Sequence, residues 1–270
     1  MSKKIILYVL LTIIAIGMAF PIVWMLLLSL KANPESIDSL FQLISTENTV
    51  NNYKDALSSD SFDIYFLNSL FVASVVTVFN LIFCTVTGYA LARKKFRGNS
   101  LILLSIIGVM MIPPHVIMIP LYRTMVNFSW INSYEALIIP WLVTPFGVFL
   151  IKQYLSNIPE TIEKAAVLDG ANQFQIITKI IFPLSKPILI VVGVYVFLMN
   201  WNSFLFPFLF TNDSDFWTLP VGLTFYLGKQ SISWGHLMAG ASMSAIPIII
   251  LFLIFQKQII KGLTAGALKE

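Results

Sequence analysis

The sequence predicts an all-α, polytopic membrane protein with six transmembrane helices and both termini in the cytoplasm. The chain of 270 residues is 57% hydrophobic and only 11% charged, with a mean hydropathy of +0.84. A water-soluble domain of this size could not cover its surface with so few charges. Long uncharged segments and an uneven distribution of Lys and Arg support the same fold class, and we interpret residues 1–270 as one membrane domain.

A transmembrane helix needs about 20 mostly apolar residues. The first apolar segment follows Lys3 and Lys4, so a cleaved signal peptide is an alternative interpretation. We favour an uncleaved span, because the apolar stretch is too long for a signal peptide. The fourth segment is short, and we expect it to borrow residues at both ends. The six predicted spans are Ile5–Leu30, Phe66–Leu91, Leu101–Tyr122, Ala136–Ile151, Pro187–Phe210 and Gly240–Ile259.

The distribution of Lys and Arg predicts the orientation, because cytoplasmic loops of membrane proteins are rich in these residues. With cytoplasmic termini, most of the 17 basic residues lie inside and most of the acids outside. The basic residues left outside are Lys31, Lys54, Arg123 and Lys229. Residues 152–186 then form the longest cytoplasmic segment. Residues 31–65 form an acidic and polar outer segment, which we expect to be partly helical and to cover the outer rim.

The predicted spans contain no Asp, Glu or Arg, and their one Lys, Lys257, lies near the cytoplasmic end of the sixth span. Ion-coupled transporters usually carry such groups in the membrane as ion ligands or proton relays, so this mechanism is disfavoured. His115 could serve as a relay, but beside Pro113-Pro114 it fits better as a polar group in a kinked segment. Proline removes a backbone donor, and this pair is expected to bend the third span.

Catalysis is not expected in this chain. The only Gly-Lys pair is Gly228-Lys229, followed by Gln230, so the phosphate-binding pattern G-x-x-x-x-G-K-[ST] is missing. No H-E-x-x-H motif or Cys/His cluster suggests a metal, and the single Cys84 excludes an intramolecular disulfide. If the protein does work, we expect the energy to enter from another subunit that docks on the cytoplasmic side.

The stretch EKAAVLDGANQFQ, residues 163–175, is a polar element between two apolar segments. We predict a first helix over Glu160–Leu168, since Pro159 and Glu160 suit a helix start. Asp169 and Gly170 interrupt it: Asp can cap the next helix, and Gly can adopt a left-handed conformation or allow close backbone approach.

A second helix is predicted over Ala171–Phe182, ended by Pro183 and Pro187. Its Phe174, Ile177 and Ile181 would share one apolar face. Such a face fits a groove on a partner protein, and small residues at the turn let two backbones approach closely. An amphipathic helix resting on the lipid surface would explain the apolar face equally well, but not the small residues.

This stretch resembles the cytoplasmic EAA loop of permease subunits of binding-protein-dependent ATP-binding-cassette importers. The usual pattern Glu-Ala-Ala-x-x-Asp-Gly-Ala corresponds to Lys164–Ala171, with Lys164 in place of the first Glu and Glu163 just before it. Short segments along nearly the whole chain resemble the carbohydrate branch of this family, and more narrowly the six-span member of the maltose-type permease pair. They are NYKDAL (52–57), YFLNSL (65–70), GYALARKKFRG (88–98), IPLY (119–122), TLPVGL (218–223), LMAGA (237–241) and GLTAGALK (262–269).

The resemblance implies a multi-pass subunit of the bacterial cytoplasmic membrane that imports a di- or oligosaccharide. Its implied partners are a second, related permease, two ATPase subunits that bind ATP and Mg, an extracytoplasmic sugar-binding protein and the lipid bilayer, with no role for nucleic acid. The loop would dock in a cleft of one ATPase, and the tail TAGALKE (264–270) would reach toward the ATPase dimer interface. The implied docking residues are Glu163, Lys164, Ala165, Ala166, Leu168, Asp169, Gly170 and Ala171.

A neutral sugar needs hydrogen-bonding groups and apolar or aromatic faces. The fifth predicted span offers Asn200, Trp201, Asn202 and Ser203 as candidate pathway residues. Hydrogen bonding between helices is the alternative role for such groups. The family often has Trp-Asn-Asp-Phe here, whereas this chain has Ser203 in place of the Asp. For the whole protein, the alternative function is a self-contained secondary sugar carrier or channel with a membrane-surface loop helix.

Overall fold

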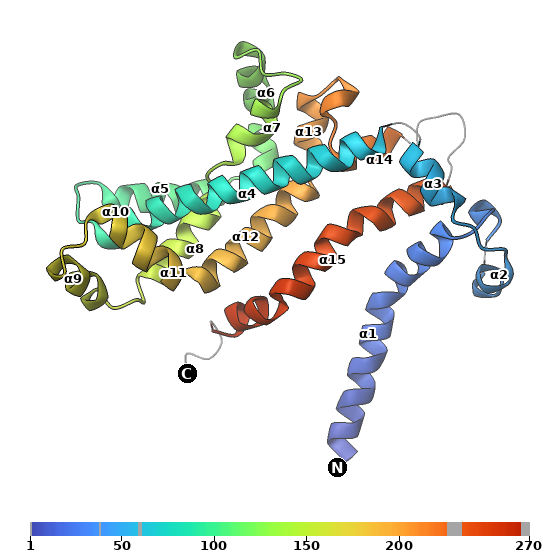
Figure 1. The fold of residues 1–270 in the computed structure, drawn as a ribbon, viewed down its shortest axis with the longest axis horizontal. Coiled ribbons are helices and arrows are strands. Elements are labelled where there is room, and N and C mark those ends of the chain that lie inside the picture. The colour runs from blue at the N-terminus through green and yellow to red at the C-terminus, as the bar shows by residue number, and fades with distance from the viewer. Residues whose placement is uncertain (1, 38, 59–60, 226–233, 266–270) are drawn as a thin grey trace. The chain divides into compact units, whose positions relative to one another are not determined.

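The computed structural model describes residues 2–37, 39–58, 61–225 and 234–265 (Figure 1). The described residues form helices and connecting turns, with one isolated antiparallel bridge between Lys31 and Asn48. The α-helices are α1 (Ser2–Ser29), α2 (Leu40–Ser45), α3 (Asn51–Ser58), α4 (Phe62–Arg93), α5 (Asn99–Met110), α6 (Met118–Asn127), α7 (Tyr134–Ile138), α8 (Pro145–Leu155), α9 (Thr161–Leu168), α10 (Gln173–Gln175), α11 (Phe182–Leu184), α12 (Lys186–Trp201), α13 (Leu205–Phe210), α14 (Leu219–Phe225) and α15 (Trp234–Ala265). The shorter helices are the 3-10 turns η1 (Pro34–Ser36), η2 (Pro114–Ile117), η3 (Ile139–Trp141) and η5 (Ser214–Phe216), and the π-helix η4 (Ile176–Ile181).

Four helical segments of the described chain are long and apolar enough to cross a membrane. They are Lys4–Ser29, Phe62–Arg93, Tyr134–Leu155 and Trp234–Ile259. Two bent pairs meet the same criterion, and six candidate spans result if each pair crosses once. The segment Tyr134–Leu155 extends beyond the fourth predicted span, Ala136–Ile151, at both ends, as expected from the sequence.

The third predicted span is not one straight helix. Helix α5 ends at Met110, and the chain resumes as η2 and α6 at an angle of 94°. Pro113 and Pro114 lie at the break, where neither can donate a backbone hydrogen bond to the preceding turn. The bend expected from this proline pair is therefore confirmed, and it divides the span into two pieces.

The fifth predicted span, Pro187–Phe210, is also not continuous. Helix α12 ends at Trp201, and a break at residues 202–204 separates it from α13. The Asn202 side chain donates to the Leu198 carbonyl, 2.9 Å away, which favours termination over continuation of the helix. At its other end, α12 meets α11 at a bend of 78° beside Ser185.

The chain divides into two compact units. Unit 1 comprises Met1–Phe66 and Leu219–Ile248. It contains α1, the short helices α2 and α3, and α14, so the prediction that residues 31–65 are partly helical is confirmed. The Asn52 amide donates to the Ser29 carbonyl at 2.9 Å and the Lys31 carbonyl at 2.8 Å, which fixes α3 against the end of α1.

Unit 2 comprises Leu67–Thr218 and Ile249–Glu270. Its core is formed mainly by α4, α8 and α12, through buried Val76, Val148, Ile151, Val192 and Val196. Figure 1 shows α9, α10 and α11 beside the end of α4, whereas α6, α7 and α13 group elsewhere in this unit. The end of α4 therefore lies next to the loop around residues 163–175, for which the sequence predicts docking to a partner.

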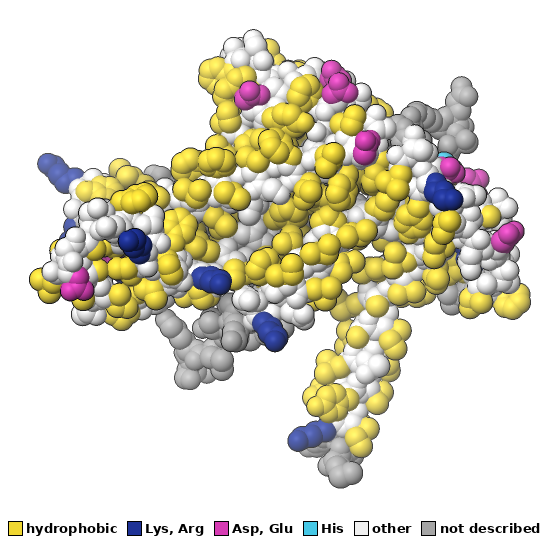
Figure 2. All heavy atoms as spheres, in the orientation of Figure 1, with side chains coloured by type: hydrophobic (Ala, Val, Ile, Leu, Met, Phe, Trp, Pro, Cys, Tyr) yellow, Lys and Arg dark blue, Asp and Glu magenta, His cyan; other side chains and the backbone are white. Residues whose placement is uncertain are grey.

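Most of the visible surface is apolar, and charged side chains appear as separate spots (Figure 2). Helix α1 exposes the most apolar surface of this kind, because none of its apolar stretch is buried against other described residues. In water such a surface would associate or aggregate, whereas a lipid bilayer or a partner helix satisfies it.

Candidate functional site

The loop between α8 and α12 contains a sharp corner, residues 165–172, between α9 and α10. Helix α9 ends with two backbone hydrogen bonds: Ala171 N–H donates to the Ala166 carbonyl at 2.9 Å, and Gly170 N–H donates to the Val167 carbonyl at 3.0 Å. This is a Schellman C-cap, which requires a left-handed residue after the cap. Gly170 has φ +84°, so the sequence prediction of a left-handed glycine is confirmed.

The helix that follows the corner differs from the prediction at both ends. Asn172, not Asp169, caps α10: its Oδ1 accepts from Gln175 N–H, while the Gln175 side chain accepts from Asn172 N–H, both at 2.9 Å. Asp169 is instead the C-cap of α9. The helical segment continues through Pro183 to Leu184, because a proline in the first turn of α11 is compatible with a helix.

The predicted apolar face of Phe174, Ile177 and Ile181 is also not formed as expected. Phe174 is 74% exposed, while Ile176 and Ile181 are buried in the core. The segment 176–181 is a π-helix, whose wider turn puts residues five apart on one side. The prediction used α-helical spacing and therefore placed Ile181 on one face with Phe174, whereas in the structure Ile181 is buried together with Ile176.

The corner presents opposite surfaces to the protein and to the outside. Ala166 and Ala171 are half-buried and pack against the core of unit 2. Leu168 is 88% exposed, and Val167 and Phe174 are exposed as well. Small residues thus hold the corner close to the core, while larger apolar side chains face outward.

The remaining candidate docking residues divide between these two surfaces. Ala165, Asp169 and Gly170 are exposed. Lys164 is exposed too, and its Nζ lies 3.4 Å from Glu160 Oε2 in an ion pair whose side chains are 73% and 58% exposed. Glu163 points the other way, into the protein.

Glu163 takes part in a partly buried polar network that sequence reasoning missed. Its Oε1 accepts from Arg93 Nε at 2.6 Å, and the two side chains are only 12% and 7% exposed. Its Oε2 accepts from the Tyr89 hydroxyl at 3.0 Å. Gln173 Nε2 donates to the same Tyr89 oxygen at 2.7 Å. Tyr89, Arg93, Glu163 and Gln173, called the joint below, connect the end of α4 with both sides of the corner.

The candidate pathway residues lie at the end of α12. Asn200 Nδ2 donates to the Val196 carbonyl at 2.9 Å, and Asn202 bonds in the same way to Leu198, so both amides turn onto their own helix. Trp201 is 2% exposed and stacks on Phe197, with ring centroids 5.7 Å apart. Ser203 is half-buried in the break before α13.

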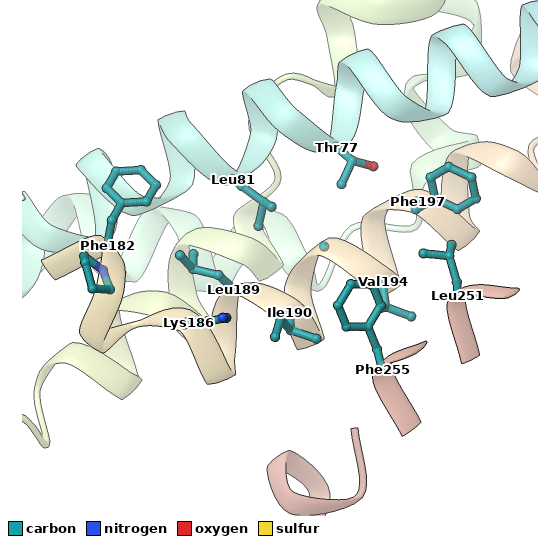
Figure 3. A pocket seen from close by; sticks show the side chains of 12 residues that line it. Thr77, Leu81, Phe182, Lys186, Leu189, Ile190, Val194, Phe197, Leu251 and Phe255 are labelled. Atoms are coloured by element: carbon teal, nitrogen blue, oxygen red, sulfur yellow. The ribbon is translucent and has the colours of Figure 1, made fainter. Parts of the chain in front are cut away.

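A cavity of about 330 Å³ lies elsewhere in unit 2, among α4, α11, α12 and α15 (Figure 3). Of the twelve residues that line it, only Thr77 and Lys186 have polar side chains, and the Thr77 hydroxyl already donates to the Ala73 carbonyl. A sugar buried here would lose hydrogen bonds to water without replacement. The lining therefore suits apolar occupants rather than a sugar.

These features define a helical, multi-pass membrane protein with a structured loop that exposes apolar side chains. The chain belongs to the family of inner membrane components of binding-protein-dependent transport systems, whose sequence profile matches residues 84–264. It is similar to the trehalose/maltose transport system permease protein MalG of Thermococcus litoralis, with 35% identity over 99% of this chain and 97% of that protein. It is also similar to the arabinooligosaccharides transport system permease protein AraQ of Halalkalibacterium halodurans, with 34% identity over 95% and 93%.

The fold itself has a solved counterpart. A chain of a bacterial ABC transporter that imports the acidic polysaccharide alginate matches with a TM-score of 0.83 over 95% of this chain and 96% of that chain, at 24% identity. The structural likeness supports the helical permease architecture, while the family membership rests on the sequence profile and on the relatives above.

Proposed function

We propose that this chain is the permease subunit of an ATP-driven importer for a di- or oligosaccharide, coupled to a separate ATPase through the loop 160–182. The sequence relatives named above are permeases for trehalose/maltose and for arabinooligosaccharides, which supports a sugar substrate. A second permease, two ATPase subunits and an extracytoplasmic binding protein would complete the transporter. The chain itself would perform no catalysis, and ATP with Mg would bind in the ATPase.

The observation that carries this proposal is the outward surface of the corner. Leu168, Val167 and Phe174 are exposed although a loop in water would favour polar residues there. An apolar face on a rigid helical corner fits the groove of a partner protein. The corner keeps its shape through the Schellman cap and the Asn172 capping box, so docking would cost little ordering of the backbone.

Leu168→Asp tests this docking directly. The side chain is 88% exposed, so the substitution should leave the fold intact while placing a charge in the proposed interface. We expect the tagged variant to insert and retain the second permease but to lose the ATPase on co-purification. Ser156→Asp introduces the same charge at an exposed position of the same loop, at the end of α8, and should retain the ATPase. Equal ATPase recovery with both variants would contradict the docking site.

We further propose six spans with both termini in the cytoplasm of a cell membrane. In a chain whose native Cys84 is replaced by Ser, a single cysteine at Ser58 would then react with a membrane-impermeant maleimide in intact cells, whereas one at Ser156 would react only after permeabilisation. Both positions are exposed and lie outside the candidate spans. The reverse labelling pattern would overturn the orientation.

The competing function, a self-contained carrier or channel, makes a different prediction. The purified chain alone, in proteoliposomes, would then carry sugar down a gradient without ATP. We expect no flux of radiolabelled maltose, trehalose or arabinotriose under these conditions. Uptake is expected only when the ATPase, the second permease and the binding protein are present.

A further inference from the structure

We propose that the joint, formed by Tyr89, Arg93, Glu163 and Gln173, makes the docking corner move together with the end of α4. These residues would act as positioning residues that transmit the movement of an attached ATPase to a membrane-spanning helix. The inference rests on the proposed function, because it requires that the corner receives the ATPase.

The first argument is that one hydroxyl group bridges the two sides of the corner. Glu163 lies in α9, before the corner, and Gln173 begins α10, after it. The Tyr89 hydroxyl donates to Glu163 Oε2 at 3.0 Å and accepts from Gln173 Nε2 at 2.7 Å. Opening or closing the angle between α9 and α10 would break one of these bonds, so the corner is held as a single body.

The second argument is that Arg93 fixes the loop before α9 as well. Its Nη2 donates to the Ile158 carbonyl at 2.8 Å, while its Nε bonds Glu163 at 2.6 Å. Lys94, the next residue after α4, donates to Gln173 Oε1 at 2.7 Å, and its Nζ lies 5.7 Å from the centre of the Tyr89 ring. The last turn of α4 therefore holds three successive parts of the loop.

The third argument is the contrast in burial between the two ion pairs of α9. The Arg93–Glu163 side chains are nearly inaccessible, whereas the Lys164–Glu160 pair is exposed. Water and salt screen an exposed pair strongly and a buried pair much less. The inward connection to α4 is thus the strong one, and the outward face of α9 remains available for a partner.

The fourth argument is that α4 can transmit a displacement along its whole length. It is an uninterrupted helix of 32 residues, roughly 48 Å long at 1.5 Å per residue. Displacement of its end by the corner would shift the helix as a rigid element rather than be absorbed locally. By contrast, the covalent route from the corner to α12 passes through a π-helix and a bend of 78°.

The test uses the complete transporter in proteoliposomes with its binding protein, and measures sugar uptake and ATP hydrolysis in parallel. Radiolabelled maltose, trehalose and arabinotriose serve as probes. Tyr89→Phe removes only the bridging oxygen, and Glu163→Gln removes the charge while keeping the side-chain shape. The matched control is Tyr154→Phe, which also loses one hydroxyl bond, the 3.2 Å contact with the Leu184 carbonyl, but does not touch the corner.

We expect Tyr89→Phe and Glu163→Gln to retain the ATPase in the purified complex and to lower the sugar transported per ATP by about fivefold or more, the effect of losing one typical hydrogen bond. The double variant should be no worse than the poorer single variant, because both act through one joint. Tyr154→Phe should transport as the unchanged protein does.

Three results would overturn the joint while leaving the proposed function intact. They are an unchanged sugar-to-ATP ratio in both variants, an equal fall with Tyr154→Phe, and loss of the ATPase from the variant complexes, which would show a role in assembly instead. If the unchanged chain itself retains no ATPase, or imports sugar without ATP, the proposed function fails and the joint fails with it.

Discussion

Gly170 separates the backbone requirement of the corner from its proposed contact with an ATPase. Its φ of +84° is unfavourable for a side chain, yet a Cβ built there has no neighbouring atom of the described chain within 4 Å. In the isolated protein, a substitution therefore costs backbone strain and causes no steric clash. Backbone strain and contact with an ATPase predict opposite orders of damage for the two substitutions Gly170→Ala and Gly170→Asp.

The strain can be estimated from the left-handed conformation. Alanine pays about 1–2 kcal/mol there, whereas Asp and Asn visit this region more readily and pay less. A cost of about 1–2 kcal/mol changes the population of the folded corner by a factor of about 5–30. On strain alone, Gly170→Ala should thus be the more damaging variant. A charged side chain in a protein interface must lose its water, so docking predicts the opposite order.

We therefore expect Gly170→Asp to abolish uptake while the chain still inserts, and Gly170→Ala to retain a measurable fraction. Uptake of the three radiolabelled sugars is measured in cells that contain the whole transporter, and the inserted chain is quantified by immunoblot of the membrane fraction. Normal uptake by the Asp variant, or uptake higher than that of the Ala variant at equal insertion, would refute a close contact at the corner.

Three further predictions concern stability, measured as the melting temperature of the purified chain in detergent. Arg93→Met should lower the stability by about 3 kcal/mol, since it leaves the buried carboxylate of Glu163 unpaired. Lys164→Met should change the stability little, because its ion pair is exposed. Equal melting temperatures of the two variants would contradict a stronger contribution of the buried pair. Asn68→Leu should cost about 2 kcal/mol, because two loop carbonyls lose their donor, and chymotrypsin should then cut after Phe216 or Trp217 faster. Gly222→Ala should cost about 1–3 kcal/mol, as its Cβ would overlap the Tyr65 ring, and an unchanged melting temperature would show that unit 1 can relax there.

Features that depend on local sequence could be predicted well. Apolar length predicted the spans at both ends of the chain, because a long uncharged segment has few alternatives to a helix. Pro113-Pro114 predicted the bend after α5, and Gly170 predicted the left-handed residue of the corner, since both follow from the backbone properties of single residue types.

Two kinds of feature could not be predicted in the same way: those for which neighbouring residues compete, and those that depend on contacts between residues distant in the sequence. Asp169 and Asn172 are both good helix caps, and only the Schellman cap of α9 decides that Asn172 begins the next helix. The π-helix at 176–181 has no marker in the residue types, so the apolar face was assigned with the wrong period. The joint depends on Arg93 and Glu163, which are 70 residues apart, and no local pattern connects them.

Helix α4 shows why polar residues in a spanning segment need not mark a transport pathway. Asn68 donates to the carbonyls of Asp215 and Trp217, and Asn80 donates to the carbonyl of Trp141. Arg93 does the same for Ile158. Each accepting carbonyl lies in or beside a 3-10 turn or in a loop, where the α-helical backbone supplies no donor.

These three donors are spaced 12 and 13 residues apart along α4. At about 100° per residue, Asn68 and Arg93 lie on nearly the same side of an ideal helix, and Asn80 lies about 120° away. One rigid helix therefore holds the irregular segments around 215–217, 141–144 and 158–163 together. A displacement that enters at Arg93 would reach the other two segments through the same helix, so the joint is connected to irregular segments that are distant from it in the sequence.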